Sequence, residues 1–376
     1  MITYSNHDKL SWLKRQKALL VWQVLQCSIK GRISASCGSD RSENEVSVNS
    51  NSSHDSEMHM QNNQEQPLYI YTYACTGDEE SLCGMELRCL FGREIPAAIF
   101  GSGTQVEVSR SPFIKERIDV MYSGDRLEDI YKQTEQVEVE GQTFKVIFVK
   151  TNDLSPEEKI EYDERRAIER EIGLRIEGEA DVNHPERVYG IVTLGGRWYF
   201  GVYHKNKATW FRQMNKPRSY SIALSTRVAR AAVNMAVPHP EGVRAIDPCC
   251  GIGTVMVEAL SMGIDIVGRD INPQIAAGAR TNIAHFGFTS VVTLGDIADI
   301  QEHYDVAIVD MPYNLYSRIT PEEQLAILVH TRRIADRAVI VAIEAVDEMI
   351  AEAGFAIIDR CVAKKGAFSR HLMLCE

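Results

Sequence analysis

Residues 247–254 read Asp-Pro-Cys-Cys-Gly-Ile-Gly-Thr and lie where a predicted strand gives way to a predicted helix. Gly251 and Gly253 let the backbone turn tightly and approach a ligand closely. The helix N-terminus that follows presents free N–H groups and a positive partial charge, which favour a carboxylate. Met256 occupies the position of the third glycine of the dinucleotide-binding motif. The turn therefore suits S-adenosylmethionine, which carries a carboxylate and no pyrophosphate, better than a dinucleotide.

Strands and helices alternate on both sides of this turn from residue 241 onward. The predicted strands cover residues 244–248, 264–270, 290–294, 304–310 and 338–344, and the predicted helices cover residues 254–262, 272–287 and 321–334. Such alternation predicts right-handed crossovers and a mostly parallel sheet. Two final strands, 355–363 and 368–376, have no helix between them, so an antiparallel last strand is expected. That ending separates Rossmann-like methyltransferases from nicotinamide dehydrogenases, and the predicted fold class is α/β of the methyltransferase type.

Three further aspartates end successive predicted strands, at the edge where an open α/β sheet binds its ligand. Asp270 follows the second strand, at the place where the ribose hydroxyls of an adenosine would lie. Asp296 follows the third strand and is a candidate acceptor for the adenine amine. The alternative for each is an aspartate that caps a surface helix. We expect these carboxylates to converge with Asp247 and Asp310 on one crevice.

The fourth aspartate opens the tetrad Asp310-Met311-Pro312-Tyr313, which resembles the Asp-Pro-Pro-Tyr motif of methyltransferases that act on exocyclic amines. In that family the aspartate side chain and a main-chain carbonyl accept the amine hydrogens, and the tyrosine stacks on the base. The resemblance implies that Asp310 orients the amine and takes its proton, with Tyr313 as the platform for an extruded base. Met311 departs from the motif, where the family has a proline.

Elements upstream of the cofactor turn predict an α+β region. Strands are expected at residues 68–75, 187–194 and 197–204, helices at 80–91 and 156–172, and short elements at 97–101, 105–109 and 116–124. Gly195-Gly196 indicates a hairpin, and Ser155 is an expected helix N-cap. The segment 178–203 resembles the strand and hairpin end of a THUMP domain, an RNA-binding module of tRNA modification enzymes.

Residues 68–376 as a whole resemble the THUMP-containing tRNA guanosine N2-methyltransferases that act on guanosine 10. Residues 220–236 resemble the helix before the cofactor turn in that family, which implies a role for Ser221 or Ser225 near the methionine end of the cofactor. The implied cofactor is S-adenosylmethionine and the implied partner is tRNA, with no metal and no membrane. The expected domains are a ferredoxin-like module at 68–145, a THUMP-like domain at 146–215 and a class I Rossmann-like methyltransferase domain at 216–376.

Three sets of candidate site residues follow from the motifs and the resemblance. The catalytic candidates are Asp310, Pro312 and Tyr313. The cofactor-binding candidates are Asp247, Cys249, Gly251, Gly253, Thr254, Asp270, Ile271, Asp296 and Ile297. The RNA-binding candidates are Lys205, Lys207, Arg212, Lys216 and Arg218. Cys249 and Cys250 invite a nucleophile role, but their position in the turn favours packing.

The chain of 376 residues has 41 lysines and arginines against 52 aspartates and glutamates, a formal charge of −11 that excludes a chain-wide basic field. The segment 197–230 is the exception, with eight positive charges, no acidic residue and seven interleaved aromatic residues. Two interpretations are open. The segment is either an RNA surface, with cations for phosphates and rings for bases, or a pair of strands with inward aromatics and a solvated charged face.

Residues 33–67 contain nine serines and five asparagines and few bulky apolar residues, so we expect residues 1–67 to be a disordered or non-native leader without function. The apolar run at 18–29 is better explained by a surface helix or leader than by a secretory signal. Nine cysteines, an odd number, without Cys-x-x-Cys spacing predict a reduced, cytoplasmic location. A monomer is favoured.

The expected function is methylation of the exocyclic N2 amine of a tRNA guanosine. One alternative keeps the fold and changes the substrate to ribosomal RNA, DNA adenine or a protein amide. Another is a noncatalytic RNA-binding relative, for which the Met311 departure is the warning sign. Binding of S-adenosylmethionine separates an enzyme from a relative that has lost the pocket.

Overall fold

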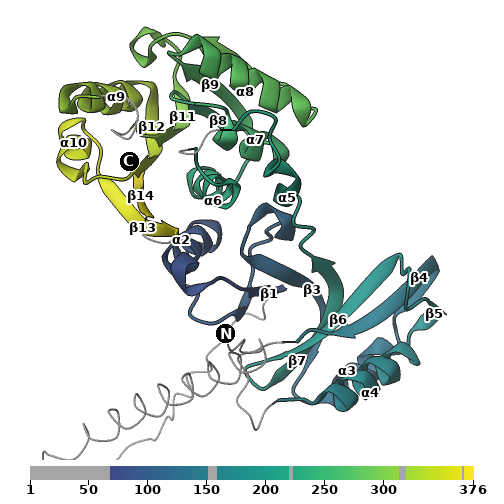
Figure 1. Ribbon diagram of the computed structural model, residues 1–376. Coiled ribbons are helices and arrows are strands. Elements are labelled where there is room, and N and C mark those ends of the chain that lie inside the picture. The colour runs from purple at the N-terminus through teal and green to yellow at the C-terminus, as the bar shows by residue number, and fades with distance from the viewer. Residues whose placement is uncertain (1–67, 151–158, 220–222, 313–318, 366–367) are drawn as a thin grey trace, which may run out of the picture. The chain divides into compact units, whose positions relative to one another are not determined.

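The computed structural model describes residues 68–150, 159–219, 223–312, 319–365 and 368–376, and the expected leader at 1–67 lies outside them. In this part of the chain the strands form two seven-stranded sheets (Figure 1). The N-terminal sheet is formed by strands between Tyr69 and Lys205, and the C-terminal sheet by strands between Arg244 and Cys375, where the predicted cofactor turn follows the first strand. Among the described helices, none is both long enough and apolar enough to cross a bilayer.

The C-terminal sheet has the strand order β10-β9-β8-β11-β12-β14-β13. Its strands are β8 (Arg244–Asp247), β9 (Asp265–Asp270), β10 (Val292–Leu294), β11 (Tyr304–Asp310), β12 (Ala335–Ala342), β13 (Ile357–Lys365) and β14 (Phe368–Cys375). The first five are parallel, and β14 runs antiparallel to both of its neighbours. This order confirms the predicted Rossmann-like methyltransferase fold. The chain reverses its direction of winding between β8 and β11, the point where such sheets bind ligands.

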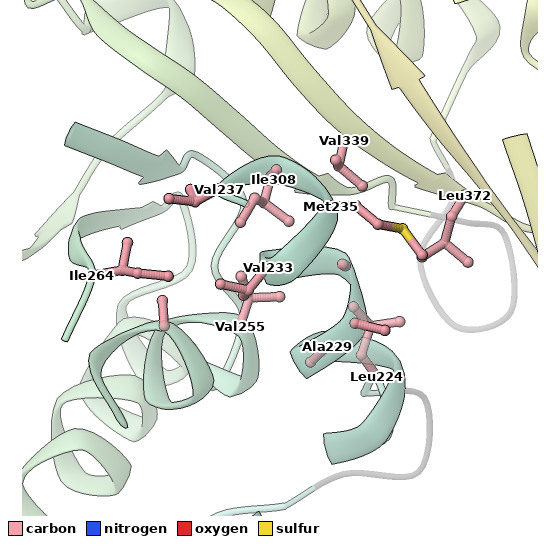
Figure 2. Close-up of a cluster of buried hydrophobic side chains, with 14 of the residues drawn as sticks. Leu224, Ala229, Val233, Met235, Val237, Val255, Ile264, Ile308, Val339 and Leu372 are labelled. Carbon is pink, nitrogen blue, oxygen red and sulfur yellow. The ribbon is translucent and has the colours of Figure 1, made fainter. Parts of the chain in front are cut away.

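Helices cover both faces of this sheet because alternate strand residues are apolar on either side. The helices are α6 (Thr226–Ala236), α7 (Thr254–Ser261), α8 (Pro273–His285), α9 (Pro321–Ile334) and α10 (Asp347–Glu352). Met235 of α6 packs against Val339 and Leu372 on one face (Figure 2). Leu328 of α9 packs with Val309 on the other.

The N-terminal sheet has the order β2-β1-β3-β7-β6-β4-β5. Its strands are β1 (Tyr69–Tyr73), β2 (Ile99–Ser102), β3 (Ile114–Gly124), β4 (Glu138–Phe148), β5 (Glu177–Ala180), β6 (Arg187–Leu194) and β7 (Arg197–Lys205). The predicted hairpin is confirmed: β6 and β7 are antiparallel, and Gly195 and Gly196 have φ of 58° and 77°. The expected boundary between residues 145 and 146 falls inside β4, and β3 pairs with β7, so strands from both expected modules share one sheet.

Helices of the N-terminal region are α2 (Glu80–Phe91), α3 (Leu127–Thr134) and α4 (Tyr162–Gly173). The prediction for α2 is confirmed to the residue, whereas α3 and β4 were not predicted. Of the helix expected at residues 156–172, the described chain shows the part from Tyr162 onward, with Ile168 and Ile172 as its buried residues. The proposed N-cap, Ser155, lies outside the described residues. The short element expected at 105–109 is instead a 3-10 turn at Val108–Arg110.

A buried arginine joins α6 to neighbouring segments. The Arg230 side chain is 2% exposed and donates to Glu258 Oε2 of α7 at 2.8 Å. It also donates to the main-chain oxygens of Ser109 and Arg110, each at 2.8 Å. On the same helix Asn234 donates to the buried carboxylate of Glu86 at 2.6 Å. Burial raises the pKa of Glu86 to about 7. Because nearly every donor in this network has a partner, removing one member leaves buried charge uncompensated.

We expect Arg230→Met to lower the free energy of unfolding by about 3–5 kcal/mol, because it strands the Glu258 carboxylate in the interior. Urea unfolding followed by circular dichroism measures this. The matched control is Arg360→Ala, which breaks an ion pair with Asp347 whose side chains are 54% and 47% exposed. That control should cost less than about 1 kcal/mol. Equal losses in the two variants would contradict the role given to the buried pair.

Candidate functional site

A cavity of about 570 Å³ opens at the carboxyl ends of the central strands of the C-terminal sheet. Its walls bring together most of the residues predicted for the cofactor and the reaction. These are Asp247, Cys249, Gly251, Thr254, Asp270, Ile271, Asp296, Ile297, Asp310 and Pro312. All four aspartates thus reach a single crevice, as expected from strands that end at the same edge. Tyr313 lies outside the described residues, so its predicted role as a stacking platform stays a prediction.

The glycine turn after β8 adopts the backbone that only glycine accepts readily. Gly251 and Gly253 have φ of 53° and 77°, in the left-handed region. The Gly251 N–H donates to Asp270 Oδ2 at 3.0 Å, which ties the turn to the end of β9. A Cβ on Gly253 would come within 3.2 Å of the Ala279 Cβ on α8. Gly251 therefore shapes the cavity wall, whereas Gly253 permits close helix packing.

Asp270 and Ile271 form the wall at the end of β9. Asp270 accepts hydrogen bonds from the N–H groups of Gly251 and of Asn272, the latter at 2.8 Å on Oδ1. Burial raises the pKa of Asp270, and these two amides oppose the rise. Each carboxylate oxygen retains a second lone pair for a ligand hydroxyl. Ile271 is 70% exposed on the cavity wall, an apolar surface to which a flat ring can bind.

Asp296 caps the 3-10 helix η3 (Ile297–Asp299), since its Oδ1 accepts from the Ala298 N–H at 2.9 Å. The alternative considered from the sequence, a capping aspartate, is therefore realised here. Capping engages one oxygen only, and the residue still lines the cavity beside Ile297. A structural role and a ligand role are compatible at this position.

Asp247 and Asp310 are the buried pair of the site. Among the described residues, Oδ1 of each carboxylate is buried without a hydrogen-bond partner. Burial raises the pKa of Asp310 to about 7, against the opposing charge of Arg370. Burial and then the Asp310 charge raise the pKa of Asp247 well above its usual range. Unpaired buried acceptors of this kind carry a cost that incoming N–H donors or a cation would relieve.

The two cysteines of the turn are poor nucleophiles. Burial, with the charge of Asp247 next in size, raises the pKa of both the Cys249 and Cys250 thiols. A thiol held protonated reacts slowly because the thiolate is the nucleophile. The structure thus favours the packing role, and Cys250 indeed belongs to the buried apolar cluster.

Met311 makes use of its departure from the proline motif. Its N–H donates to the Val341 carbonyl at 2.8 Å, continuing the pairing of β11 with β12. A proline has no N–H and could not make this bond. The next carbonyl, that of Pro312, accepts from Gln324 Nε2 of α9 at 3.3 Å. The described part of the tetrad is therefore held by hydrogen bonds in place of ring stiffness.

Sequence reasoning missed one wall of the cavity, the face of α9 formed by Glu323, Ala326, Ile327 and His330. Their spacing of three or four residues was the available signal, because such residues share a helix face. It also missed Ala223 and Leu224, which line the cavity before α6. Of the two serines predicted as alternatives near the cofactor, Ser225 caps α6 by accepting from the Val228 N–H at 3.4 Å, and Ser221 lies outside the described residues. Within the described ranges, no group of three or more His, Cys, Asp or Glu side chains is placed to hold a metal ion.

The basic segment 197–230 divides between the two interpretations. Its aromatic rings follow the inward-strand interpretation: Tyr199, Phe200 and Trp210 are buried, and only Phe211, 56% exposed, is clearly open to solvent among the described ones. Among the cationic candidates, Lys205, Lys207, Arg212 and Arg218 are exposed. Lys216 instead turns inward to the Gln213 carbonyl, and burial lowers its pKa. Cations are available here, whereas most rings are not.

The raised pKa of Asp310 predicts how the free energy of unfolding depends on pH. The folded carboxyl has a pKa of about 7, while an unfolded aspartate has one of about 4. The folded state binds more protons between these values, so the free energy of unfolding falls as the pH rises. We expect the stability advantage of Asp310→Asn over the wild type, measured by urea unfolding, to grow by about 1–3 kcal/mol from pH 5 to pH 8. Asp336→Asn, with a 76% exposed side chain, should show no such growth; a flat difference for Asp310→Asn would contradict the burial argument.

The part of the chain that contains this cavity is similar to known methyltransferases. Residues 213–338 match the model of UPF0020, the RMKL-like methyltransferase domain. The tRNA (guanine(10)-N2)-dimethyltransferase of Methanothermobacter thermautotrophicus is 30% identical over 169 residues, which cover 42% of this chain and 50% of that protein. The enzyme of the same name from Pyrococcus abyssi is 35% identical over 104 residues, 26% of this chain and 31% of that one. The matched part of the chain thus spans about half the length of the first relative and about a third of the second.

Among solved structures, TrmN from Thermus thermophilus aligns with a TM-score of 0.40 and 16% identity over 82% of this chain and 99% of that chain. The matched residues 213–338 run from the end of the short helix α5 (Trp210–Gln213) into β12, and they contain the glycine turn and all four aspartates. The strand order of the sheet agrees with the match. Residues 213–338 are therefore similar to the UPF0020, RMKL-like methyltransferase domain, and the chain is similar to the tRNA (guanine(10)-N2)-dimethyltransferases over part of their length.

Proposed function

We propose that this protein transfers a methyl group from S-adenosylmethionine to the exocyclic N2 amine of a guanosine in tRNA, at position 10. The observation that carries the proposal is Asp310 Oδ1, which is buried without a hydrogen-bond partner among the described residues and shares one cavity with the glycine turn and Asp270. A site that can hold an amine group and a site that can hold the nucleoside of the cofactor would then lie next to each other in one cavity. The names of the related enzymes support the choice of tRNA and of guanine N2.

The cavity fits the cofactor on three observations. Its volume of about 570 Å³ is in the range of small-molecule sites. The unpartnered Oδ1 of Asp247 suits a cationic group, and the free lone pairs of Asp270 suit ribose hydroxyls. Ile271 and Ile297 offer apolar surface to the adenine, and Asp296 offers an acceptor to its amine. The remaining candidates, Cys249, Gly251, Gly253 and Thr254, would shape the turn around the methionine part.

When bound, S-adenosylmethionine supplies a methyl group activated by its positive sulfonium. The N2 lone pair of guanine is delocalised into the ring, so the protein has to hold the amine and draw on its N–H bonds. We infer that Asp310 and a main-chain carbonyl of the tetrad accept these hydrogens, and that Asp310 takes the proton released by transfer. Positioning and electrostatics then supply most of the rate gain. Pro312 shapes the loop, and Tyr313 is proposed to stack on the extruded base.

The RNA contact is proposed for four exposed cations at the end of β7 and in the segment that follows it: Lys205, Lys207, Arg212 and Arg218. Phosphate contacts from such a strip would let an acidic protein bind tRNA. Lys216 is a weaker candidate because its amino group is bonded inward. The THUMP-like character of the N-terminal sheet belongs to this proposal, as does a cytoplasmic location, which the free thiols of the described cysteines support.

The decisive experiment incubates the protein with tRNA and methyl-labelled cofactor and identifies the methylated nucleoside by mass spectrometry. We expect N2-methylguanosine or N2,N2-dimethylguanosine, with at least a 100-fold loss of rate in Asp310→Asn. The rate should also rise with pH through about 7 and then level off, because only the ionised Asp310 carboxylate can take the proton released by transfer. Tight cofactor binding by the variant, measured by calorimetry, would show that its pocket is intact.

Three outcomes would contradict the proposal. Label on a guanine carbon or ring nitrogen would exclude exocyclic amine chemistry. Label on ribosomal RNA or DNA adenine, with none on tRNA, would favour the same-fold alternative. Absence of any heat with S-adenosylmethionine would favour a noncatalytic RNA-binding relative.

The RNA surface makes a separate prediction. We expect alanine at Lys205, Lys207 and Arg212 together to weaken tRNA binding at least ten-fold and to flatten its salt dependence, because phosphate contacts release counterions. Filter binding across a salt series measures both effects. The matched control places alanine at Arg126, Lys132 and Arg166, three exposed cations of α3, its cap and α4. Unchanged binding by the first variant, or equal loss in both, would sink this assignment.

A further inference from the structure

His330 is a polar residue on the cavity wall that has no role in the proposed reaction. It follows Glu323, Ala326 and Ile327 along the face of α9 that lines the cavity. Among the described residues, its ring nitrogen Nδ1 is buried without a hydrogen-bond partner, while the residue as a whole is partly exposed. A buried ring nitrogen without a partner is unfavourable unless a ligand supplies one. The sequence offered no motif that would have pointed to this histidine.

The direction of α9 shows which end of the cavity His330 occupies. Near the start of the helix, Gln324 donates to the Pro312 carbonyl, so this end faces the tetrad. Near the other end, Arg333 donates to the Ile300 carbonyl at 2.6 Å and to the Ala298 carbonyl at 3.1 Å. His330 lies one turn before Arg333 and about 9 Å along the helix from Gln324. It therefore belongs to the end of the cavity bounded by η3 and Asp296, away from Asp310.

We propose that His330 is a specificity residue for the adenine of the cofactor, accepting a hydrogen bond at Nδ1 from the exocyclic amine. This inference rests on the proposed function, which puts adenine at the Asp296 end of the cavity. The adenine amine has two hydrogens, and Asp296 has one oxygen engaged in its cap and another free for one of them. Nδ1 takes the second hydrogen, in the neutral tautomer whose proton is on Nε2. Hypoxanthine, with a carbonyl in place of the amine, would meet two acceptors there and be rejected.

The test compares two neutral probes, S-adenosylhomocysteine and S-inosylhomocysteine, by calorimetry on the full chain. The wild type should prefer the adenine probe. His330→Phe keeps the ring and removes the acceptor, so we expect about a ten-fold weaker affinity for the adenine probe and an equal or stronger affinity for the inosine probe, which then meets one acceptor fewer. His330→Asn places an amide oxygen near the position of Nδ1 and should retain most of the preference.

The matched control is Val329→Ala, the neighbouring helix residue, which is 44% exposed and outside the cavity wall. It should bind both probes as the wild type does. Equal weakening of both probes by His330→Phe, or an unchanged preference, would overturn the assignment of His330. Loss of the preference in both the Phe and Asn variants would overturn it too, as a purely steric effect. Failure of the wild type to bind S-adenosylhomocysteine would instead overturn the proposed function itself.

Discussion

Crowding of carboxylates at one sheet edge is the constraint on which the site depends. Asp247 is buried and Asp310 is partly exposed, and Oδ1 of each is buried without a hydrogen-bond partner among the described residues. The opposing charge of Arg370 does not outweigh the burial of Asp310, whose pKa remains about 7. Such a cavity is favourable only when a cation and N–H donors enter it. The sulfonium cofactor and the aromatic amine of the proposed reaction would supply such groups.

Backbone hydrogen bonds hold these carboxylates in place. The Gly251 N–H fixes Asp270 at the end of the neighbouring strand, and the Met311 N–H extends the pairing of β11 with β12 directly after Asp310. Gln324 then holds the Pro312 carbonyl from α9. Sites built on strand ends are more precise than sites on free loops because their backbone is already paired. With Met311 in place of a proline, the described start of the tetrad is thus held by main-chain and side-chain hydrogen bonds.

The junction at α6 connects the site to residues far upstream in the chain. Leu224 lines the cavity just before α6, and Arg230 and Asn234 of the same helix bond to Ser109, Arg110 and Glu86. Movement of this helix would disturb both the buried network and the cavity wall. The buried polar groups therefore constrain the position of a cavity-lining segment, beyond any contribution to stability.

Local signals in the sequence were enough to predict the Rossmann-like, mostly parallel sheet, the final antiparallel strand and the meeting of four aspartates. Each depends on short-range rules, namely the period of apolar residues, the glycine turn and the missing crossover helix. Tertiary structure alone decided which aromatics of segment 197–230 are buried, that Lys216 turns inward, that one sheet continues through residue 145, and that His330 faces the cavity. These features depend on contacts between residues distant in sequence, which no local pattern records.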